Sequence, residues 1–227
     1  MKVDIYLKAA FDTPFNIGTG MLAESIADKP LAKDASRRPM IPGSTLKGRV
    51  RHECERIIRA LIDPWPKDWE CEAPDPKEMC KGSNICPICQ IFGSPWHPSR
   101  IIFDNLTLEI MAKAPPRNWK QLHGIRATDL RAGVGINRER GVAEDDLLYS
   151  TETFSPHPAL VYQGHINGSL QERKEVALLL AGLRSVPALG SSRSRGLGWW
   201  HLEISVKLDG QSTPVDELIQ EVGKWCH

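Results

Sequence analysis

The stretch that organises the rest of this sequence is Pro39-Met40-Ile41-Pro42-Gly43-Ser44-Thr45-Leu46-Lys47-Gly48-Arg49-Val50-Arg51. Pro42-Gly43 predicts a turn, and Ser44 directly after it predicts the N-cap of a helix. Apolar side chains then recur at spacings of three and four, as in an amphipathic helix: Leu46, Val50, Cys54, Ile57 and Leu61. Free backbone N–H groups at such a helix start, beside Lys47, Arg49 and Arg51, form a place to hold a phosphate.

A second segment of the same chemistry lies near the end of the chain. It reads Gly190-Ser191-Ser192-Arg193-Ser194-Arg195-Gly196-Leu197-Gly198, and it contains arginines and glycines but no acid. Two phosphate-binding elements far apart in one chain suggest an extended anionic ligand such as RNA. The net charge of +1 does not indicate a nucleic-acid partner by itself. The charges are segregated, however, which allows a basic groove, although clusters of this kind also occur on ordinary solvated faces.

Composition places the chain among ordinary globular proteins, with 227 residues, 41% hydrophobic and 25% charged. We expect one domain over residues 1–227, with insertions at 63–98 and 133–152. The first residues are too short and too charged for a signal peptide, and no apolar run approaches the roughly 20 residues that span a bilayer. We therefore expect a cytoplasmic protein without a membrane partner.

Hydrophobic periodicity predicts an α+β chain. Alternation indicates strands over residues 2–10, 99–110, 159–168 and 197–208, and helical spacing indicates helices after Ser44, over 172–186 and over 214–226. Residues 133–152 are typical of a hairpin with its turn at 138–141. This order fits a ferredoxin-like or RNA-recognition-type antiparallel sheet, which is a frequent RNA-binding scaffold.

Four cysteines lie in the insertion at 63–98, in the pattern Cys71-x8-Cys80-x5-Cys86-x2-Cys89. Four thiolates in a segment too small for its own core suggest a structural, four-coordinate zinc with no open position for catalysis. Disulfides are the alternative, but nothing marks the chain as secreted. His52 or His97 could replace an outer cysteine. Two further cysteines are expected to be uninvolved, Cys54 in the core and Cys226 at the terminus.

Three of these segments together resemble the RAMP superfamily, and most closely the repeated backbone subunit of type III CRISPR effector complexes. They are the stretch from Ile41 to Arg51, the segment Cys86-Pro87-Ile88-Cys89 followed by Ile91-Phe92-Gly93-Ser94, and the loop from Gly190 to Trp199. The resemblance implies copies of this chain, or paralogous subunits, lined up along a CRISPR guide RNA with the other subunits of the complex. Asn137 and Arg138 would then lie on a thumb-like hairpin that wedges between nucleotides, although an isolated hairpin is also an ordinary exposed turn.

The resemblance also implies cleavage of complementary target RNA. The family places an aspartate upstream of its Ile-Pro-Gly-Ser motif, and the segment from Ile26 to Asp34 matches that pattern with one extra residue. Asp28 then falls on the catalytic position and Asp34 on a second acid. RNA supplies its own 2′-hydroxyl nucleophile, which an aligned backbone presents in line with the phosphorus. Asp28 could act as general base or position a hydrated Mg²⁺ or another divalent ion.

Two rival hypotheses stay open at this point. The chain could be a non-catalytic RNA-binding assembly subunit of the same kind of complex, since some members of the family lack the aspartate. It could also be a guide-RNA-processing endonuclease, which would use a histidine because the pKa of that side chain lies near neutrality. The available histidines show no recognisable pairing in the sequence: His52, His123, His157 and His165.

Overall fold

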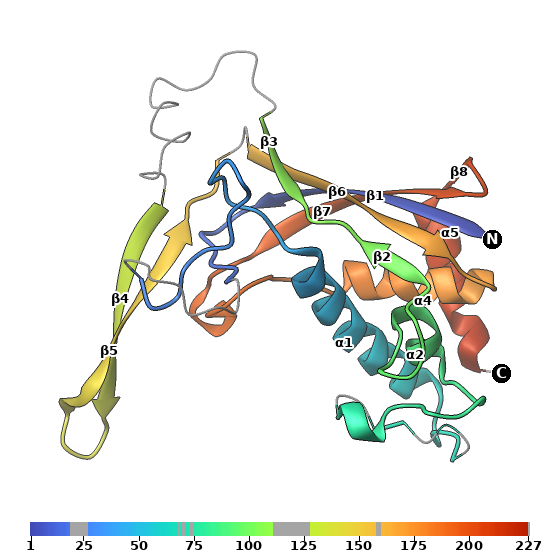
Figure 1. Cartoon of the computed structure of the whole chain (residues 1–227), viewed down its shortest axis with the longest axis horizontal. Coiled ribbons are helices and arrows are strands. Elements are labelled where there is room, and N and C mark those ends of the chain that lie inside the picture. Colours follow the sequence, from blue (N-terminus) through green and yellow to red (C-terminus); the bar gives the residue numbers. More distant parts are fainter. Residues whose placement is uncertain are drawn as a thin grey trace.

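A six-stranded sheet forms the centre of the molecule, and the helices lie on one side of it (Figure 1). The structure is a computed structural model that describes residues 1–18, 27–67, 69, 71–72, 75–110, 128–157 and 160–226. The strands are β1 (Lys2–Phe11), β2 (Ile101–Phe103), β3 (Thr107–Ile110), β4 (Thr128–Asn137), β5 (Val142–Phe154), β6 (Leu160–Ser169), β7 (Trp200–Leu208) and β8 (Gln211–Thr213). The α-helices are α1 (Gly43–Leu61), α2 (Pro87–Phe92), α4 (Arg173–Arg184) and α5 (Val215–Gln220). Short 3₁₀ turns cover Pro76–Glu78, Arg193–Arg195 and Glu221–Cys226.

The central strand of the sheet is β1, which pairs with β6 on one side and β7 on the other. The order across the sheet is β2-β6-β1-β7-β8, with β3 also on β6, and every pair is antiparallel. The α+β class with an antiparallel sheet is therefore as predicted. The ferredoxin-like interpretation of this sheet stays a prediction.

Alternation along β1 separates a buried face of the sheet from an open one. Val3, Ile5 and Leu7 are buried, whereas the residues between them are half-buried. The buried face packs on α1 and α4, which lie beneath the sheet in Figure 1. Leu46 and Cys54 of the predicted α1 stripe are fully buried there, so Cys54 belongs to the core as expected. Burial of these apolar side chains is the main term that holds the two layers together.

The start of α1 differs from the prediction, because Ser44 is not its N-cap. The helix begins at Gly43 with Pro42 as N-cap, and no side chain of the cap residue accepts a hydrogen bond. The Gly43 N–H instead donates to Asn105 Oδ1 at 2.9 Å, across 62 residues of sequence. An acceptor from a distant loop thus satisfies a free N–H of the first turn, a function that local sequence assigns to a serine.

The strand expected over residues 99–110 is divided into β2 and β3. Between them Leu106 pairs with Ile41, and each backbone N–H donates to the carbonyl of the other, at 2.9 and 3.0 Å. The chain therefore leaves the sheet for three residues to bind the segment that leads into α1. The same excursion brings Asn105 to the helix start.

β4 and β5 form a two-stranded hairpin that projects from the body on the side away from α2 (Figure 1). Residues 133–152, which were expected to form a hairpin, lie within this longer hairpin of residues 128–154, and its turn falls at 138–141. The hairpin joins the body through the backbone pair of Phe15 and Phe154 and through Lys29, which bridges Thr151. Across the described part of the chain, no helix combines the length and the apolar character needed to span a bilayer.

Candidate metal centre and nucleic-acid interface

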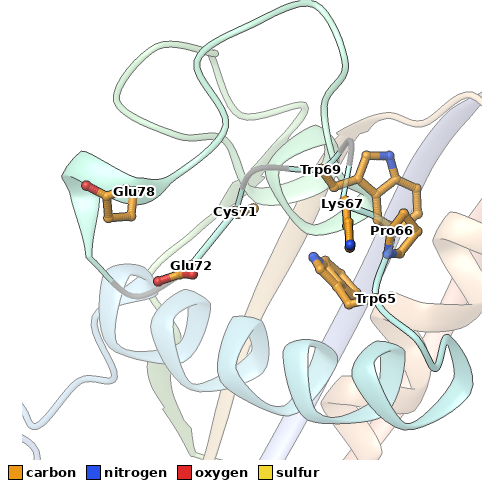
Figure 2. Close-up of a pocket in the computed structure, with 7 residues that line it drawn as sticks. All are labelled: Trp65, Pro66, Lys67, Trp69, Cys71, Glu72 and Glu78. Carbon is orange, nitrogen blue, oxygen red and sulfur yellow. The ribbon is translucent and has the colours of Figure 1, made fainter.

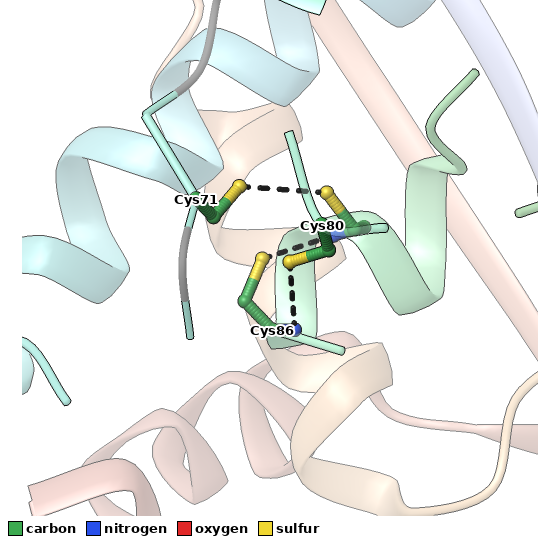
Figure 3. A group of neighbouring side chains, drawn as sticks. Cys71, Cys80 and Cys86 are labelled. Atoms are coloured by element: carbon green, nitrogen blue, oxygen red, sulfur yellow. Dashed lines mark hydrogen bonds between the residues drawn. The ribbon is translucent and has the colours of Figure 1, made fainter. Parts of the chain in front are cut away.

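Four buried cysteines meet beside the start of α2. The Sγ atoms of Cys71, Cys80, Cys86 and Cys89 all lie within 4.8 Å of one another. Figure 3 shows the sulfurs of Cys71, Cys80 and Cys86 turned into one small volume. All four are free thiols, and the alternative ligands His52 and His97 do not belong to the group that the described residues form. Four sulfurs at this spacing can hold a tetrahedral metal ion such as zinc.

Backbone geometry builds the second half of this cluster. Cys86 is the N-cap of α2, with Pro87 at the first helical position, and its Sγ accepts from the Cys89 N–H at 3.5 Å. The Cys86 N–H donates in turn to Cys80 Sγ at 3.4 Å. Backbone N–H groups directed at sulfur favour the thiolate form that binds metal. A hydrogen bond from Cys86 lowers the pKa of Cys89 to about 5, and the nearby Arg51 adds to this shift.

Arg51 lies beside this cysteine cluster, and the phosphate contact expected of it stays a prediction. Its guanidinium donates to Glu55 and to the Gly93 carbonyl, at 2.9 and 2.8 Å, and lies 3.7 Å from Cys89 Sγ. A tetrathiolate zinc centre carries excess negative charge, which a guanidinium at this position offsets. The structure thus places Arg51 as a support for the cysteines.

A cavity of about 440 Å³ has Cys71 of the cysteine cluster in its lining. Figure 2 shows its walls, with Trp65 and Trp69 on one side and Glu72 and Glu78 on the other. The two indoles meet edge to face at 5.1 Å, and the Arg59 guanidinium lies 5.0 Å from the Trp65 ring. The negative charges of these two glutamates repel a phosphate backbone, so this cavity differs from the basic surfaces described next.

A groove of about 520 Å³ separates the first turns of α1 from the segment that follows α2. Ser44 and Lys47 line one wall, and His97 and Ser99 line the other. Lys47 Nζ donates to Ser99 Oγ at 2.9 Å, and burial together with Arg51 lowers the pKa of the lysine. Ser44, Lys47 and Arg51 are thus the residues of the predicted RNA-binding set that line this groove.

Arg49 connects α1 to the glycine loop, which we define as residues 190–198. Its guanidinium pairs with the buried Glu53 at 2.6 Å. Burial lowers the pKa of Arg49, and Arg193 of the glycine loop lowers it further. The two arginines are therefore close enough to repel each other. Arg49 of α1 and Arg193 of the glycine loop thus lie within electrostatic reach of each other, and their contact with RNA stays a prediction.

The glycine loop is held by the chain just after β1. Gly190 adopts φ +101°, and a Cβ on it would lie 2.3 Å from the Asn16 carbonyl oxygen, so only glycine fits there. The Ser191 N–H donates to that oxygen at 2.8 Å. Ser192 is in the left-handed region, Arg193 is exposed, and Arg195 donates to the Tyr149 hydroxyl of the hairpin. The loop therefore joins the hairpin to the body.

Asp28 lies at the base of the hairpin, against β5. Its Oδ2 accepts from the Ser150 N–H at 2.6 Å and from Ser150 Oγ at 2.9 Å, and its own N–H donates to Ser150 Oγ at 3.1 Å. These donors lower the pKa of Asp28, since they stabilise the ionised form. The residue is exposed, and both hydrogen bonds from Ser150 to the carboxylate reach the same oxygen, Oδ2. Ile26, where the family-like pattern begins, lies outside the described residues.

Asp34 does not join Asp28. Its Oδ1 accepts from the N–H groups of Ser36 and Arg38, and its Oδ2 accepts from Arg38 Nε at 2.9 Å. These bonds close the turn of its own loop and lower the pKa of the carboxyl against the effect of burial. These three hydrogen bonds serve the turn of its own loop, and the role of Asp34 as a second acid stays a prediction.

The tip of the hairpin carries the two residues that were expected to contact nucleotides. Asn137 Oδ1 accepts from the N–H groups of Glu139 and Arg140, and its Nδ2 donates to Glu144. Asn137 thus shapes the turn. Arg138 is exposed within it.

Sequence reasoning missed the polar contacts that hold Asp28 in place. Glu152 accepts from Lys33 Nζ, the Leu31 N–H and Thr128 Oγ1. Lys29 lies 4.6 Å from the Tyr149 ring, which packs over Gly133, where a Cβ would approach Tyr149 Cζ to 2.4 Å. The sequence shows these side chains only as single polar residues, and nothing in it indicates which of them contact one another.

Two histidines lie next to aspartates in the folded chain, in pairs that the sequence did not indicate. His165 Nδ1 lies 2.9 Å from Asp4 Oδ1, on adjacent strands of the central sheet. His201 Nδ1 lies 2.6 Å from Asp12 Oδ2. His123, one of the predicted candidates, lies outside the described residues.

Comparison with known proteins identifies the family of this chain. No curated protein compared with the sequence matches it. Residues 8–203 match the RAMP superfamily, a range that includes the cysteine cluster, Asp28, the hairpin and the glycine loop. Because that match covers most of the chain, the protein belongs to the RAMP superfamily, a membership that indicates a CRISPR-associated RNA-binding subunit.

Proposed function

We propose that this chain is a guide-RNA-binding backbone subunit of a type III CRISPR effector complex, and that it cleaves complementary target RNA. The observation that carries the proposal is the position of Asp28. Its exposed carboxylate is fixed by Ser150 at the base of a projecting hairpin, and the same hairpin is tied to the glycine loop through Tyr149 and Arg195. RNA held by the loop and bent by the hairpin would pass beside this carboxylate.

Guide binding is supported by the basic side chains that α1 and the glycine loop present on one side. Lys47 lies in the open groove, and Arg49 and Arg193 are within electrostatic reach of each other. Ser44 and Lys47 would contact phosphate oxygens, whereas the glycine loop would follow the backbone with its N–H groups and arginines. Contacts of this kind position RNA without reading its sequence, as a subunit that accepts any guide requires.

The chemistry of cleavage needs few groups, because RNA supplies the 2′-hydroxyl nucleophile. Asp28 has a lowered pKa, so it is a weak proton acceptor and a good ligand for a hard cation. Asp28 would hold Mg²⁺ or another divalent ion, which supplies a metal-bound base and charge neutralisation at the phosphate. The contribution of this chain is to fix the Asp28 carboxylate through Ser150 and to align the RNA backbone through the hairpin.

Assembly with other subunits is supported by the apolar side chains of the hairpin. Leu130, Val134 and Leu148 are more than two-fifths exposed, and Val134 and Leu148 form a cross-strand pair. Exposed apolar side chains on a projecting ribbon mark an interaction surface. Other copies of this chain or paralogous backbone subunits would cover them, together with further subunits of a cytoplasmic complex.

One observation favours a second function, that of a non-catalytic assembly subunit. Asp28 closes the edge of β5 by accepting from Ser150, a role that explains an aspartate there without any chemistry. The guide-processing alternative has less support, because His165 pairs with Asp4 of the central sheet rather than with a residue of the hairpin or the glycine loop.

Reconstitution separates these functions. The chain is assembled with guide RNA and its partner subunits, and a labelled complementary RNA is added with and without Mg²⁺. Asp28→Asn keeps an acceptor for Ser150 and serves as the matched variant, beside Asp34→Asn as control. Evenly spaced, metal-dependent cuts that disappear only in Asp28→Asn support the proposal. If the wild-type complex binds the target RNA but does not cut it, the result supports the non-catalytic assembly function.

A further inference from the structure

Asn16 joins three segments of the candidate interface through one buried side chain. It is 2% exposed and lies just after β1. Its Nδ2 donates to the Lys29 carbonyl at 3.0 Å and to the Glu152 carbonyl at 2.7 Å. Its Oδ1 accepts from Ser191 Oγ at 2.8 Å. The loop of Asp28, strand β5 of the hairpin and the glycine loop thus converge on a single amide.

The contact with the glycine loop is rigid. Beyond the side-chain bond, the Asn16 carbonyl accepts from the Ser191 N–H at 2.8 Å, and the Cα of Gly190 packs directly on that carbonyl. The glycine loop can therefore not shift relative to Asn16 without breaking two hydrogen bonds. Burial makes each broken bond costly, because no water replaces the lost partner.

The contact with the Asp28 loop is equally direct. Lys29 follows Asp28, its N–H donates to the Ser150 carbonyl at 3.1 Å, and its carbonyl accepts from the Glu152 N–H at 3.1 Å. Asn16 Nδ2 is the second donor on that carbonyl. The position of Lys29 fixes the backbone of Asp28, and hence the alignment of its carboxylate with Ser150.

We propose that Asn16 is a positioning residue that couples RNA docking on the glycine loop to the placement of Asp28. The inference rests on the proposed function, because it assigns the glycine loop to guide RNA and Asp28 to cleavage. Guide RNA bound to the glycine loop would restrain Ser191 and, through Asn16, Lys29 and the Asp28 loop, which the same hydrogen bonds hold less firmly without it.

Only an amide fits this arrangement. Its Nδ2 faces two carbonyl oxygens, and its Oδ1 faces a hydroxyl donor. An aspartate of the same shape would keep the acceptor for Ser191 but turn an oxygen toward both carbonyls. Asn16→Asp therefore cuts the link to Lys29 and Glu152 while it preserves the link to the glycine loop. Ser191→Ala cuts only the bond between Ser191 Oγ and Asn16 Oδ1.

The experiment measures amide hydrogen exchange over residues 27–33 in the full chain, with and without guide RNA. We expect guide RNA to slow exchange there by about tenfold or more in the wild type, since these amides are hydrogen-bonded to β5 and to Ile17. In Asn16→Asp we expect guide affinity within about threefold of the wild type but no slowing. Single-turnover cleavage should fall by about 100-fold at saturating guide. Thr153→Val is the matched control, because this buried hydroxyl bonds only within the hairpin.

The outcomes are distinct. Guide-dependent slowing that persists in Asn16→Asp would overturn the inference, as would cleavage that falls only in proportion to lost guide binding. If Asn16→Asp fails to fold, Ser191→Ala must show a partial loss of the slowing, and an unchanged response there would also overturn the inference. A wild type that does not cleave contradicts the proposed function, whereas the exchange measurement still tests the coupling.

Discussion

The Arg51 guanidinium lies 3.7 Å from the Cys89 sulfur, whereas Lys47, one helical turn earlier and lining the same groove, donates to the Ser99 hydroxyl at 2.9 Å. Lys47 and Arg51, which the sequence places on one face of the helix, thus have different hydrogen-bond partners. One has three protein partners, and the other has a single hydroxyl partner, Ser99. This difference predicts that the two residues affect different measurements.

Lys47→Ala should weaken guide RNA binding by about three- to tenfold and reduce the slope of log affinity against log salt by about 0.7, as expected for one lost phosphate contact on a single strand. The unfolding free energy should stay close to that of the wild type. Fluorescence titration at several salt concentrations gives both values. Lys224→Ala, far along the chain and paired with Glu221, is the control. An unchanged salt slope would remove Lys47 from the RNA interface.

Arg51→Ala should instead lower stability, by about 1–3 kcal/mol, because Gly93 and Glu55 lose a donor and the thiolates lose a neighbouring cation. Chemical denaturation measures the change. Arg51→Lys keeps the charge but cannot reach three acceptors, so it should recover only part of the loss. A stable Arg51→Ala protein with weakened RNA binding would instead support the phosphate contact that the sequence predicts.

Removal of the metal should unfold the segment around the cysteines. Cys86→Ser takes away one sulfur ligand, while the serine hydroxyl can still accept at the N-cap of α2, so we expect loss of bound zinc and a lower Tm that follows from the metal alone. Metal analysis and thermal denaturation check both effects. Cys54→Ser is the matched control, since this buried thiol lies outside the cluster and its loss should lower the Tm with zinc retained. A zinc-free Cys86→Ser protein with an unchanged Tm contradicts the structural role.

Glu152 makes the anchoring of the Asp28 loop sensitive to pH. Hydrogen bonds from Lys33, Leu31 and Thr128 lower its pKa from the usual 4.5, although burial alone would raise it. A lowered pKa in the folded state means that the ionised carboxylate stabilises the fold above the usual pKa and loses this effect as the pH falls through the folded-state value. Glu152→Gln should therefore cost about 1–3 kcal/mol at pH 7 and almost nothing once the pH lies below that value.

Urea denaturation at a series of pH values tests this prediction. Glu203→Gln, which loses an exposed pair with Lys8, should cost little at any pH. A pH-independent difference between wild type and Glu152→Gln would show that the carboxylate charge is not what stabilises the loop.

Local patterns in the sequence predicted much of the fold. Alternation located β1, β6 and β7, and helical spacing located α1 and α4, because each of these elements buries one face. The sequence also predicted that Cys86 and Cys89 lie together, because the backbone turn between them is enough to bring their sulfurs close. The sequence also located the hairpin turn at 138–141.

The errors and omissions come from partners distant in sequence. Ser44 was expected to cap α1, but Asn105 supplies the acceptor from the loop between β2 and β3. Asp28 was singled out through a family-like pattern, yet Ser150, which orients its carboxylate, is 122 residues away. No neighbouring residue in the sequence marks Asn16, because its hydrogen bonds join three segments that only the folded chain brings together.

The pair Gly133 and Tyr149 also limits how this protein can change. The Tyr149 ring and the Leu147 side chain occupy the space in which side chains at Gly133 and Gly135 would stand. Around these two positions the side chains of β5 cover a stretch of β4 that is backbone alone. A larger residue at Gly133 or Gly135 would therefore need a smaller or displaced side chain at Tyr149 or Leu147. A designer who wishes to alter the reach or grip of the hairpin there has to change both strands together.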